Sequence, residues 1–425
     1  MTRASHRLGG GEPWTRLLGG DREGPLDRPR IPLVRDTIGQ DDLDALADWI
    51  RTGPRLTKGP QCLDFEARFT DWEGCGHALY VNSGSSANLL AVDALRAAGR
   101  LKDGDKVIAP AVSWTTTIAP ITQLNLRPVL CDVDLGSLGL DLDHLERLAA
   151  DEGARALMVC HVLGIPNDMR RITEICQRHD LALIEDCCEA LGSEYEGRKV
   201  GTFGDLSTFS FYFGHHMSTI EGGMVCASTR ELANVIKSLR SHGWNRDLDP
   251  AARNELRRKW DVDPFADQYT FYLPGYNFRG TDVGAFLGLR QLQKLDGFVA
   301  ARRQVWAAYD ELLAGATWRP RVPPGGVDSG FAWPLLSSHR SALAERLVAR
   351  GIETRPLICG SMGRQPWFVE TYGAAELPHA DMIHRHGMYV PINPDLSAAE
   401  VEEIAGLVLA PGPGSVAAPL PAMLA

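Results

Sequence analysis

Short apolar segments alternate with amphipathic helical segments along the first half of the 425-residue chain, and this alternation limits its fold more than any other feature. Strands are predicted at 77–83, 106–111, 127–134, 156–164 and 181–188. Helices are predicted at 41–53, 85–99 and 169–180. Because strands that alternate with helices pair mostly in parallel and are covered on both faces, we expect an α/β fold with a mostly parallel sheet.

A long helical segment indicates a second, smaller domain. Residues 284–313 carry apolar side chains at helical spacing, and the segment 387–409 closes an α+β unit at the C-terminal end. We therefore expect four parts: an N-terminal extension at 1–31, a large domain at 32–290, a small domain at 291–410 and a flexible tail at 411–425.

Charge and cysteine content exclude several classes of protein. With 44 Lys and Arg against 54 Asp and Glu, the net charge is −10, so a nucleic-acid-binding surface is not expected. The nine cysteines form no CxxC pair, which argues against a zinc site or a disulfide framework and favours a reduced, cytoplasmic protein. No membrane span or signal peptide is predicted. The sequence also lacks a GxGxxG and a P-loop motif, so neither nucleotide-binding fold is expected.

The turn at 82–90, NSGSSANLL, joins a predicted strand to a predicted helix. Gly84, Ser85 and Ser86 offer backbone N–H groups and hydroxyls at the helix N-terminus, where the helix dipole favours an anion. We interpret them as ligands of a cofactor phosphate, with an ordinary strand-to-helix turn as the alternative. Ser210, in the segment SFYFGHHMSTIEGG, is a second candidate phosphate ligand.

Two further residues are typical of a site for a phosphate-bearing aromatic cofactor. Asp186 ends an apolar strand, where open α/β sheets bind their ligands. Its carboxylate could pair with a protonated pyridine nitrogen; the alternative is a helix N-cap. Trp114 could stack on the cofactor ring, with core packing as the alternative.

Together these segments resemble the DegT/DnrJ/EryC1/StrS family of sugar aminotransferases from about Pro32 to Leu409. The segment 274–296, PGYNFRGTDVGAFLGLRQLQKLD, is similar to a signature of that family. The resemblance implies the aspartate-aminotransferase fold (fold type I), pyridoxal 5′-phosphate (PLP) as cofactor and a homodimer with shared active sites. In the family, the asparagine that matches Asn277 reaches the cofactor phosphate of the partner subunit.

The lysine that binds the cofactor covalently in this family is missing here. In the family pattern, this lysine lies five positions after a serine that matches Ser210. It also lies six positions before a glutamate that matches Glu221. Both counts lead to position 215, which is a histidine in this chain. Imidazole cannot form a Schiff base as a primary amine does, so we expect a non-covalently bound cofactor. Because histidine is a better base than lysine at neutral pH, we interpret His215 as the catalytic base.

A histidine at this position resembles the 3-dehydratase branch of the family, most of all the enzymes that remove the C3 hydroxyl of GDP-linked 4-keto-6-deoxymannose. The resemblance implies a nucleotide-linked 4-keto-6-deoxyhexose as substrate, PLP and pyridoxamine phosphate (PMP) as cofactor forms, and L-glutamate as cosubstrate, with release of ammonia and 2-oxoglutarate. The alternatives are a nucleotide-sugar aminotransferase and a catalytically silent regulatory protein of the same fold.

Another histidine-bearing branch carries an iron–sulfur cluster on cysteines downstream of the element that matches 221–223. This chain has no cysteine between Cys226 and Cys359, so we expect no iron–sulfur cluster.

The resemblance also implies roles for residues around the cofactor. Glu189 is expected near its O3′ atom, where aminotransferases of the family often have Gln or His; the alternative is a solvated helix residue. His216 is expected to face away from the cofactor. Arg355 and Arg364 are candidate ligands of the substrate diphosphate, because a guanidinium suits phosphate, or else structural arginines.

Overall fold

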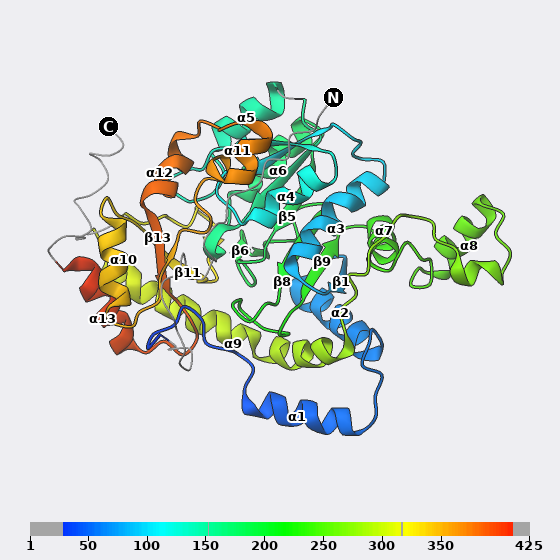
Figure 1. Cartoon of the computed structure of the whole chain (residues 1–425), viewed down its shortest axis with the longest axis horizontal. Coiled ribbons are helices and arrows are strands. Elements are labelled where there is room, and N and C mark those ends of the chain that lie inside the picture. The colour runs from blue at the N-terminus through cyan, green and yellow to red at the C-terminus, as the bar shows by residue number, and fades with distance from the viewer. Residues whose placement is uncertain (1–28, 152, 316–317, 411–425) are drawn as a thin grey trace, which may run out of the picture.

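A seven-stranded sheet forms the centre of the protein, in a computed structural model that describes residues 29–151, 153–315 and 318–410. The strand order is β1-β9-β8-β5-β4-β2-β3, and β9 runs antiparallel to its two neighbours whereas the other strands share one direction. Figure 1 shows this sheet near the centre of the molecule. The predicted α/β fold with a mostly parallel sheet is confirmed. The strands of this sheet are β1 (His77–Val81), β2 (Lys106–Pro110), β3 (Arg127–Cys131), β4 (Ala156–Cys160), β5 (Ala182–Asp186), β8 (Leu206–Ser210) and β9 (Gly223–Ala227).

Helices cover both faces of the sheet, which explains why its strands are continuous apolar runs. In β2, Val107 and Ala109 face one core cluster, whereas Ile108 between them faces another. The first cluster includes α3, α4 and α7, and the second includes α5 and α6. The helices of this region are α1 (Gln40–Arg51), α2 (Pro60–Glu73), α3 (Gly84–Ala97), α4 (Thr115–Gln123), α5 (Leu142–Asp151), α6 (Met169–Arg178), α7 (Arg230–Arg240) and α8 (Pro250–Lys259).

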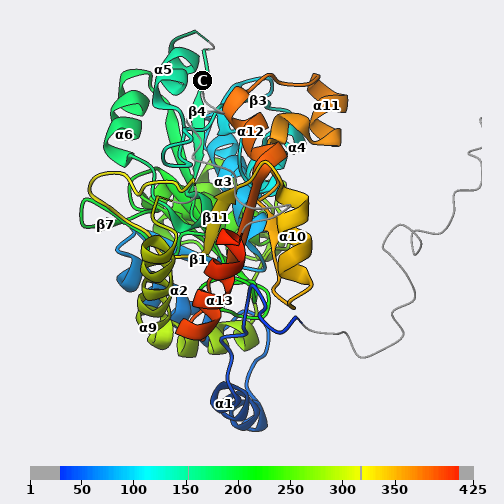
Figure 2. The same ribbon diagram turned by 90° about the vertical axis from the view of Figure 1, so that its left-hand side faces the viewer.

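The predicted long helix is confirmed as α9 (Asp282–Leu312), which connects the two halves of the chain. Its second half packs against an antiparallel sheet, β11-β13-β12, and against α13 (Figure 2). The elements of this C-terminal unit are β11 (Ala332–Leu336), α10 (Arg340–Val348), β12 (Arg355–Pro356), α11 (Pro366–Tyr372), α12 (Pro378–His386), β13 (Gly387–Pro391) and α13 (Ala398–Leu409). Short elements complete the fold: η2 (Val162–Gly164), β6 (Glu194–Tyr195), β7 (Arg198–Lys199), η3 (Ala266–Tyr269), β10 (Gly326–Val327) and η4 (Met362–Arg364).

Residues that precede α1 pack on the C-terminal unit. Ile31 forms a parallel bridge with Ile352, and Leu33 donates its backbone N–H to Glu353 Oε2 at 3.0 Å. The predicted boundary between residues 290 and 291 falls inside α9. The predicted extension, apart from residues 29–31, and the predicted tail lie outside the described residues.

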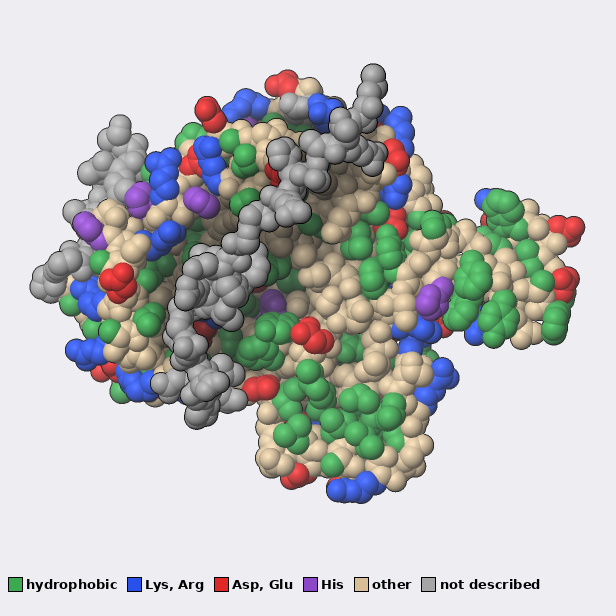
Figure 3. Space-filling view, viewed as in Figure 1, with side chains coloured by type: hydrophobic (Ala, Val, Ile, Leu, Met, Phe, Trp, Pro, Cys, Tyr) green, Lys and Arg blue, Asp and Glu red, His purple; other side chains and the backbone are tan. Residues whose placement is uncertain are grey.

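Two parts of the surface expose apolar side chains. The segment 244–272 projects from the body as an arm that carries α8, and several of its aromatic side chains are exposed: Trp260, Phe265, Tyr269 and Phe271 (Figure 3). On α1, Leu43 and Ile50 are also exposed. Across the described ranges, no helix combines the length and the apolar content that crossing a membrane requires.

Candidate active site

A cavity of about 580 Å³ opens at the carboxyl ends of the parallel strands. Asp186 at the end of β5, Ser210 at the end of β8 and Gly84 at the start of α3 form its floor, while Arg355 and Tyr389 approach from the C-terminal unit. This is the edge at which open α/β sheets bind their ligands. The structure thus brings together residues from distant parts of the sequence, from Leu33 to Tyr389.

The predicted phosphate turn forms one wall of the cavity. Gly84 and Ser85 line it together with Ser210. A Cβ atom on Gly84 would lie 2.6 Å from the Cβ of Ser210, so only glycine allows this close approach. Ser86 does not line the cavity: its backbone N–H and its hydroxyl bind the Ser83 hydroxyl, which caps α3. Ser83 lines the wall in its place.

Asp186 is a buried carboxylate held by several donors. Its Oδ2 accepts hydrogen bonds from Asn88 Nδ2 (2.9 Å) and Thr117 Oγ1 (2.8 Å), and its Oδ1 accepts from the Cys188 N–H (3.1 Å). The alternative of a helix N-cap is wrong, because a turn and the short strand β6 follow β5. The sequence did not mark Asn88 or Thr117 as donors to Asp186, although Asn88 belongs to the turn 82–90 and Thr117 follows Trp114 by three residues.

Trp114 lies at the mouth of the cavity. It is the residue before α4, it lines the cavity, and 54% of its surface is exposed. The alternative of core packing is therefore wrong. Its indole is available to stack on a flat ring.

His215 lines the cavity from the loop after β8. Its ring centroid lies 5.4 Å from that of Phe331, and its Nδ1 has no hydrogen-bond partner. Burial lowers the pKa of His215 to about 4, and the nearby Arg302 charge acts in the same direction. The imidazole is therefore uncharged at neutral pH and can accept a proton. His216 is fully buried instead and contacts the Ser329 carbonyl through Nε2 at 3.1 Å, away from the cavity.

Arg302 is a buried cation next to these histidines. Its Nη1 donates to the carbonyls of Ile392 (2.7 Å), Phe331 (3.3 Å) and Gly330 (3.4 Å), and its Nη2 donates to the His215 carbonyl (3.4 Å). All of these acceptors are neutral, so burial lowers the pKa of Arg302 to about 10. The Arg302 side chain connects the loop after β8 to the C-terminal unit, and the sequence carried no signal for it.

Glu189 lines the same cavity as His215. Its Oε2 accepts a hydrogen bond from the Leu163 N–H at 2.9 Å. Burial raises the pKa of Glu189 to about 7, and the charge of Asp186 adds to this effect. The alternative of a solvated helix residue is therefore wrong. Near pH 6 both Glu189 and His215 are mostly uncharged.

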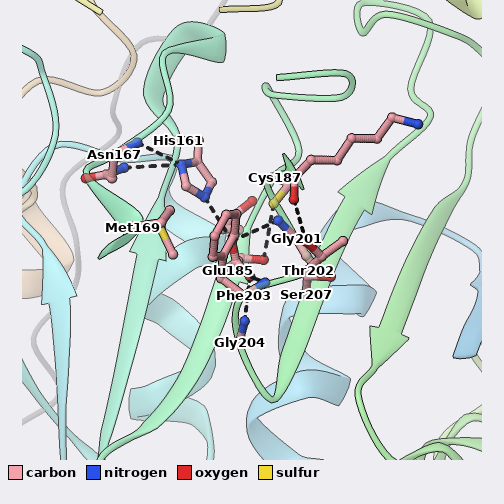
Figure 4. Close-up of polar contacts among 12 residues, drawn as sticks. His161, Asn167, Met169, Glu185, Cys187, Gly201, Thr202, Phe203, Gly204 and Ser207 are labelled. Atoms are coloured by element: carbon pink, nitrogen blue, oxygen red, sulfur yellow. Dashed lines mark hydrogen bonds and ion pairs between the residues drawn. The ribbon is translucent and has the colours of Figure 1, made fainter. Parts of the chain in front are cut away.

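Beneath Asp186, on the opposite face of β5, a second polar group has the residue types of a metal site (Figure 4). The donors of Glu185, His161 and Cys187 lie within 4.8 Å of one another. However, the Glu185 carboxylate already accepts from His161 Nε2 (3.3 Å) and from three loop N–H groups, those of Gly201 (2.8 Å), Phe203 (2.7 Å) and Gly204 (2.7 Å). Four donors satisfy a carboxylate, so this group stabilises the loop under the active site.

The remaining predicted residues have different surroundings. Arg355 lines the cavity and forms an ion pair with Glu353 at 2.6 Å. Arg364 instead binds the Asp381 carboxylate through two nitrogens, at 2.8 and 2.5 Å, and does not line the cavity. Asn277 accepts a hydrogen bond from Arg279 Nε at 3.0 Å and does not line the cavity of its own chain.

The sequence profile of the DegT/DnrJ/EryC1/StrS aminotransferase family matches residues 36–409. The chain belongs to this family. The predicted family is thus confirmed over nearly the whole of the described chain.

Several members of the DegT/DnrJ/EryC1/StrS family resemble this chain over most of its length. The GDP-4-keto-6-deoxy-D-mannose 3-dehydratase of Yersinia pseudotuberculosis is 34% identical over 370 residues, which cover 85% of this chain and 93% of that protein. The dTDP-4-dehydro-2,6-dideoxy-D-glucose 3-dehydratase of Saccharopolyspora spinosa is 38% identical over 371 residues, which cover 82% of this chain and 80% of that protein.

A solved structure shows the same likeness in three dimensions. The crystal structure of GDP-4-keto-6-deoxymannose-3-dehydratase with a trapped PLP–glutamate geminal diamine matches with a TM-score of 0.82 at 28% identity, covering 89% of this chain and all of that one. The predicted aspartate-aminotransferase fold is thereby confirmed.

The buried carboxyl of Glu189 predicts a pH-dependent stability. Its pKa in the folded protein, about 7, lies above the ordinary 4.5, so folding favours the protonated form. The stability from this group is complete below about pH 4.5 and is lost as the pH rises through 7. Glu189→Gln keeps a neutral side chain, so its melting temperature should exceed that of the wild type at pH 8 and match it near pH 5.

Thermal unfolding of the protein without added ligands, from pH 5 to pH 8, measures this difference. Glu402→Gln on the exposed face of α13 is the control and should follow the wild type at every pH. A Glu189→Gln curve parallel to that of the wild type would show that Glu189 is ionised throughout this range.

Proposed function

We propose that the protein is a PLP- and PMP-dependent sugar 3-dehydratase that removes the C3 hydroxyl of a nucleotide-linked 4-keto-6-deoxyhexose. The observation that carries this proposal is His215, which lines the cavity at the position of the family's cofactor-binding lysine. The cavity wall contains no lysine among its residues, so a Schiff base to the protein is not available there. Two similar proteins are named as 3-dehydratases, which supports the same activity here.

The cavity residues fit a cofactor that is held without a covalent bond. One wall of the cavity suits a phosphate, because it combines the N-terminus of α3 with two hydroxyl groups. It is formed by Gly84, Ser85 and Ser210. The oriented Asp186 carboxylate suits a protonated pyridine nitrogen, and Trp114 provides an exposed ring for stacking. When bound as PMP, the cofactor would supply an amine for the sugar ketone and an electron sink for C–O cleavage.

His215 supplies the proton transfer in this proposal. Because its imidazole is uncharged at neutral pH, a ring nitrogen could accept a proton from the amine-bearing carbon of a bound cofactor. A group with a pKa near 4 also gives up that proton readily, so the same imidazole can protonate the leaving hydroxyl. Arg302 holds the backbone of this loop and disfavours a permanently charged imidazole.

L-Glutamate is the proposed source of reducing equivalents. A structurally similar 3-dehydratase was trapped with a PLP–glutamate adduct, which supports the use of this amino acid. The products would then be ammonia and 2-oxoglutarate, with no need for an iron–sulfur cluster. The nine cysteines are free thiols, which agrees with the proposed cytoplasmic location.

His215→Asn tests the proposed base. Removing a positioned general base should lower dehydration by about 10²–10⁴-fold while PLP still binds. The protein is incubated with PLP, L-glutamate and GDP-4-keto-6-deoxymannose, and the sugar nucleotide is read by mass spectrometry. The wild type should release a product that has lost the C3 oxygen, together with ammonia and 2-oxoglutarate.

Exposed His339, next to α10, provides the control variant His339→Asn, which should react like the wild type. Dehydration by His215→Asn at the wild-type rate would remove His215 from its role. A wild-type product in which an amine replaces the ketone would identify an aminotransferase instead.

GDP-4-keto-6-deoxymannose is the first proposed substrate, and Arg355 is the proposed ligand of its diphosphate. Arg355 lines the cavity, whereas Arg364 is engaged by Asp381. Charge-assisted hydrogen bonds of this kind contribute about 1.5–3 kcal/mol, so Arg355→Met should raise the KM for the sugar nucleotide about tenfold or more. The KM for L-glutamate should change less.

Arg364→Met is the matched control, and steady-state kinetics with GDP- and dTDP-linked substrates measures both variants. Equal effects of the two substitutions would contradict a specific role for Arg355. A lower KM for the dTDP-linked sugar would assign the other nucleotide, since one similar protein is named for a dTDP-linked substrate.

A homodimer with shared active sites is the proposed assembly. Asn277 is absent from the cavity of its own chain, and the exposed aromatic side chains of the arm offer an apolar surface for a second copy. If Asn277 acts in the partner's site, His215→Asn and Asn277→Ala damage different sites. Each mixed dimer then contains one intact site and one doubly altered site.

Mixing the two variants after mild dissociation should therefore restore about one quarter of the wild-type activity, because random pairing makes half of the dimers mixed. Each variant alone, treated in the same way, is the control. If the mixture is no more active than the separate variants, Asn277 serves its own chain or no site at all.

A further inference from the structure

Cys75 and Cys226 form a close pair of thiols outside the active site. Cys75 lies between α2 and β1, and Cys226 lies on β9, where it is opposite Ala78 of β1. Their sulfur atoms are 3.1 Å apart, close enough for a hydrogen bond between the two thiols. Both residues are free cysteines, with no disulfide between them in this structure.

The two thiols differ in exposure and in acidity. Cys75 is half-buried, whereas Cys226 is 2% exposed. A hydrogen bond from the Cys226 thiol lowers the pKa of Cys75 most, and the backbone N–H groups of Cys75 and His77 add to this effect, against the opposing effect of burial. Burial and the neighbouring thiolate raise the pKa of Cys226. Cys75, the more exposed of the two, is therefore the thiol that ionises first.

The surroundings of the pair tolerate a thiolate. Glu73 is 3% exposed, both of its carboxyl oxygens lack a hydrogen-bond partner, and burial raises its pKa well above the ordinary value. A protonated Glu73 places no second negative charge beside Cys75. The Lys199 amine lies near Glu73 and over the Trp72 ring at 3.6 Å, and burial lowers its pKa.

We propose that Cys75 and Cys226 are a redox-active pair that a hydroperoxide converts to a disulfide. The Cys75 thiolate attacks a peroxide oxygen, breaks the O–O bond and becomes a sulfenic acid. The Cys226 thiol then attacks the Cys75 sulfur, and water leaves as the S–S bond forms. In total two thiols lose two electrons and two protons, and hydrogen peroxide is reduced to two molecules of water. A dithiol reductant reverses the change.

The position of the pair separates it from the catalytic cavity. Gly223 at the other end of β9 pairs with Ser210, which lines the cavity, whereas Cys226 pairs with Ser207. A disulfide would tie the α2–β1 connection to β9 and hold β1, the edge strand of the sheet, in place. We therefore expect oxidation to raise the melting temperature and to leave the KM for the sugar nucleotide unchanged.

Mass spectrometry of the full-length protein tests the pair directly. The protein is treated with a small molar excess of hydrogen peroxide, its remaining thiols are alkylated, and it is digested without reduction. The wild type should lose the mass of two hydrogen atoms, yield a cross-linked peptide containing Cys75 and Cys226, and return to the starting mass with dithiothreitol. Cys359→Ser, at a half-buried cysteine away from the cavity wall, should form the same cross-link.

Single variants assign the two roles. Cys226→Ser should stop at the sulfenic acid on Cys75, which dimedone labels, and Cys75→Ser should leave Cys226 as an unreacted thiol. Free alkylation of both thiols in the peroxide-treated wild type would overturn the proposal. A cross-link between other cysteines, or peroxide reactivity that persists at Cys226 in Cys75→Ser, would overturn it as well. These readouts do not depend on sugar turnover, so they stand apart from the test of the proposed function.

Discussion

A single buried carboxylate connects most of the elements that build the active site. Asp186 ends β5, and the two side chains that donate to it come from α3 and α4. Asn88 in turn accepts from Thr208 of β8 at 2.6 Å. Burying an ionised carboxylate is costly unless its lone pairs are satisfied, so this network requires that the two helices and the two strands keep one relative position. The cavity forms where that requirement is met.

The electrostatics of the cavity follow from burial more than from pairing. Arg302 is a guanidinium whose hydrogen bonds all end on backbone carbonyls, and burial lowers its pKa to about 10. Its charge and the burial of the imidazole keep His215 uncharged, while burial keeps much of Glu189 protonated near neutral pH. A lysine at position 215 would place a second cation beside Arg302. A neutral imidazole avoids that repulsion and can still transfer a proton, which is consistent with the proposed dehydration.

The part of the cavity that contains Arg355 depends on segments that are far apart in the chain. Leu33 and Val34 line it beside Arg355, and the Glu353 carboxylate binds both the Leu33 N–H and the Arg355 guanidinium. One glutamate therefore sets the position of an N-terminal backbone segment and of a cationic side chain. This arrangement gives the C-terminal unit a direct part in shaping the cavity, although the proposed chemistry takes place on the large sheet.

The sequence by itself determined the parallel sheet, the family and the substitution at position 215, because these depend on local patterns: apolar runs, turn residues and fixed spacing between motifs. It also located Gly84, Ser85, Asp186 and Ser210, which lie at the ends of predicted elements.

Only the tertiary structure decided the rest. Asn88, Thr117 and Arg302 act through contacts with residues far away in the sequence, and no local pattern marks such contacts. For the same reason, two predicted ligands have other partners. Ser86 bonds the capping residue of α3, and Arg364 pairs with Asp381, so neither lines the cavity. The sequence specifies which residues are present. Folding decides which of them share one cavity and how far burial shifts their pKa values.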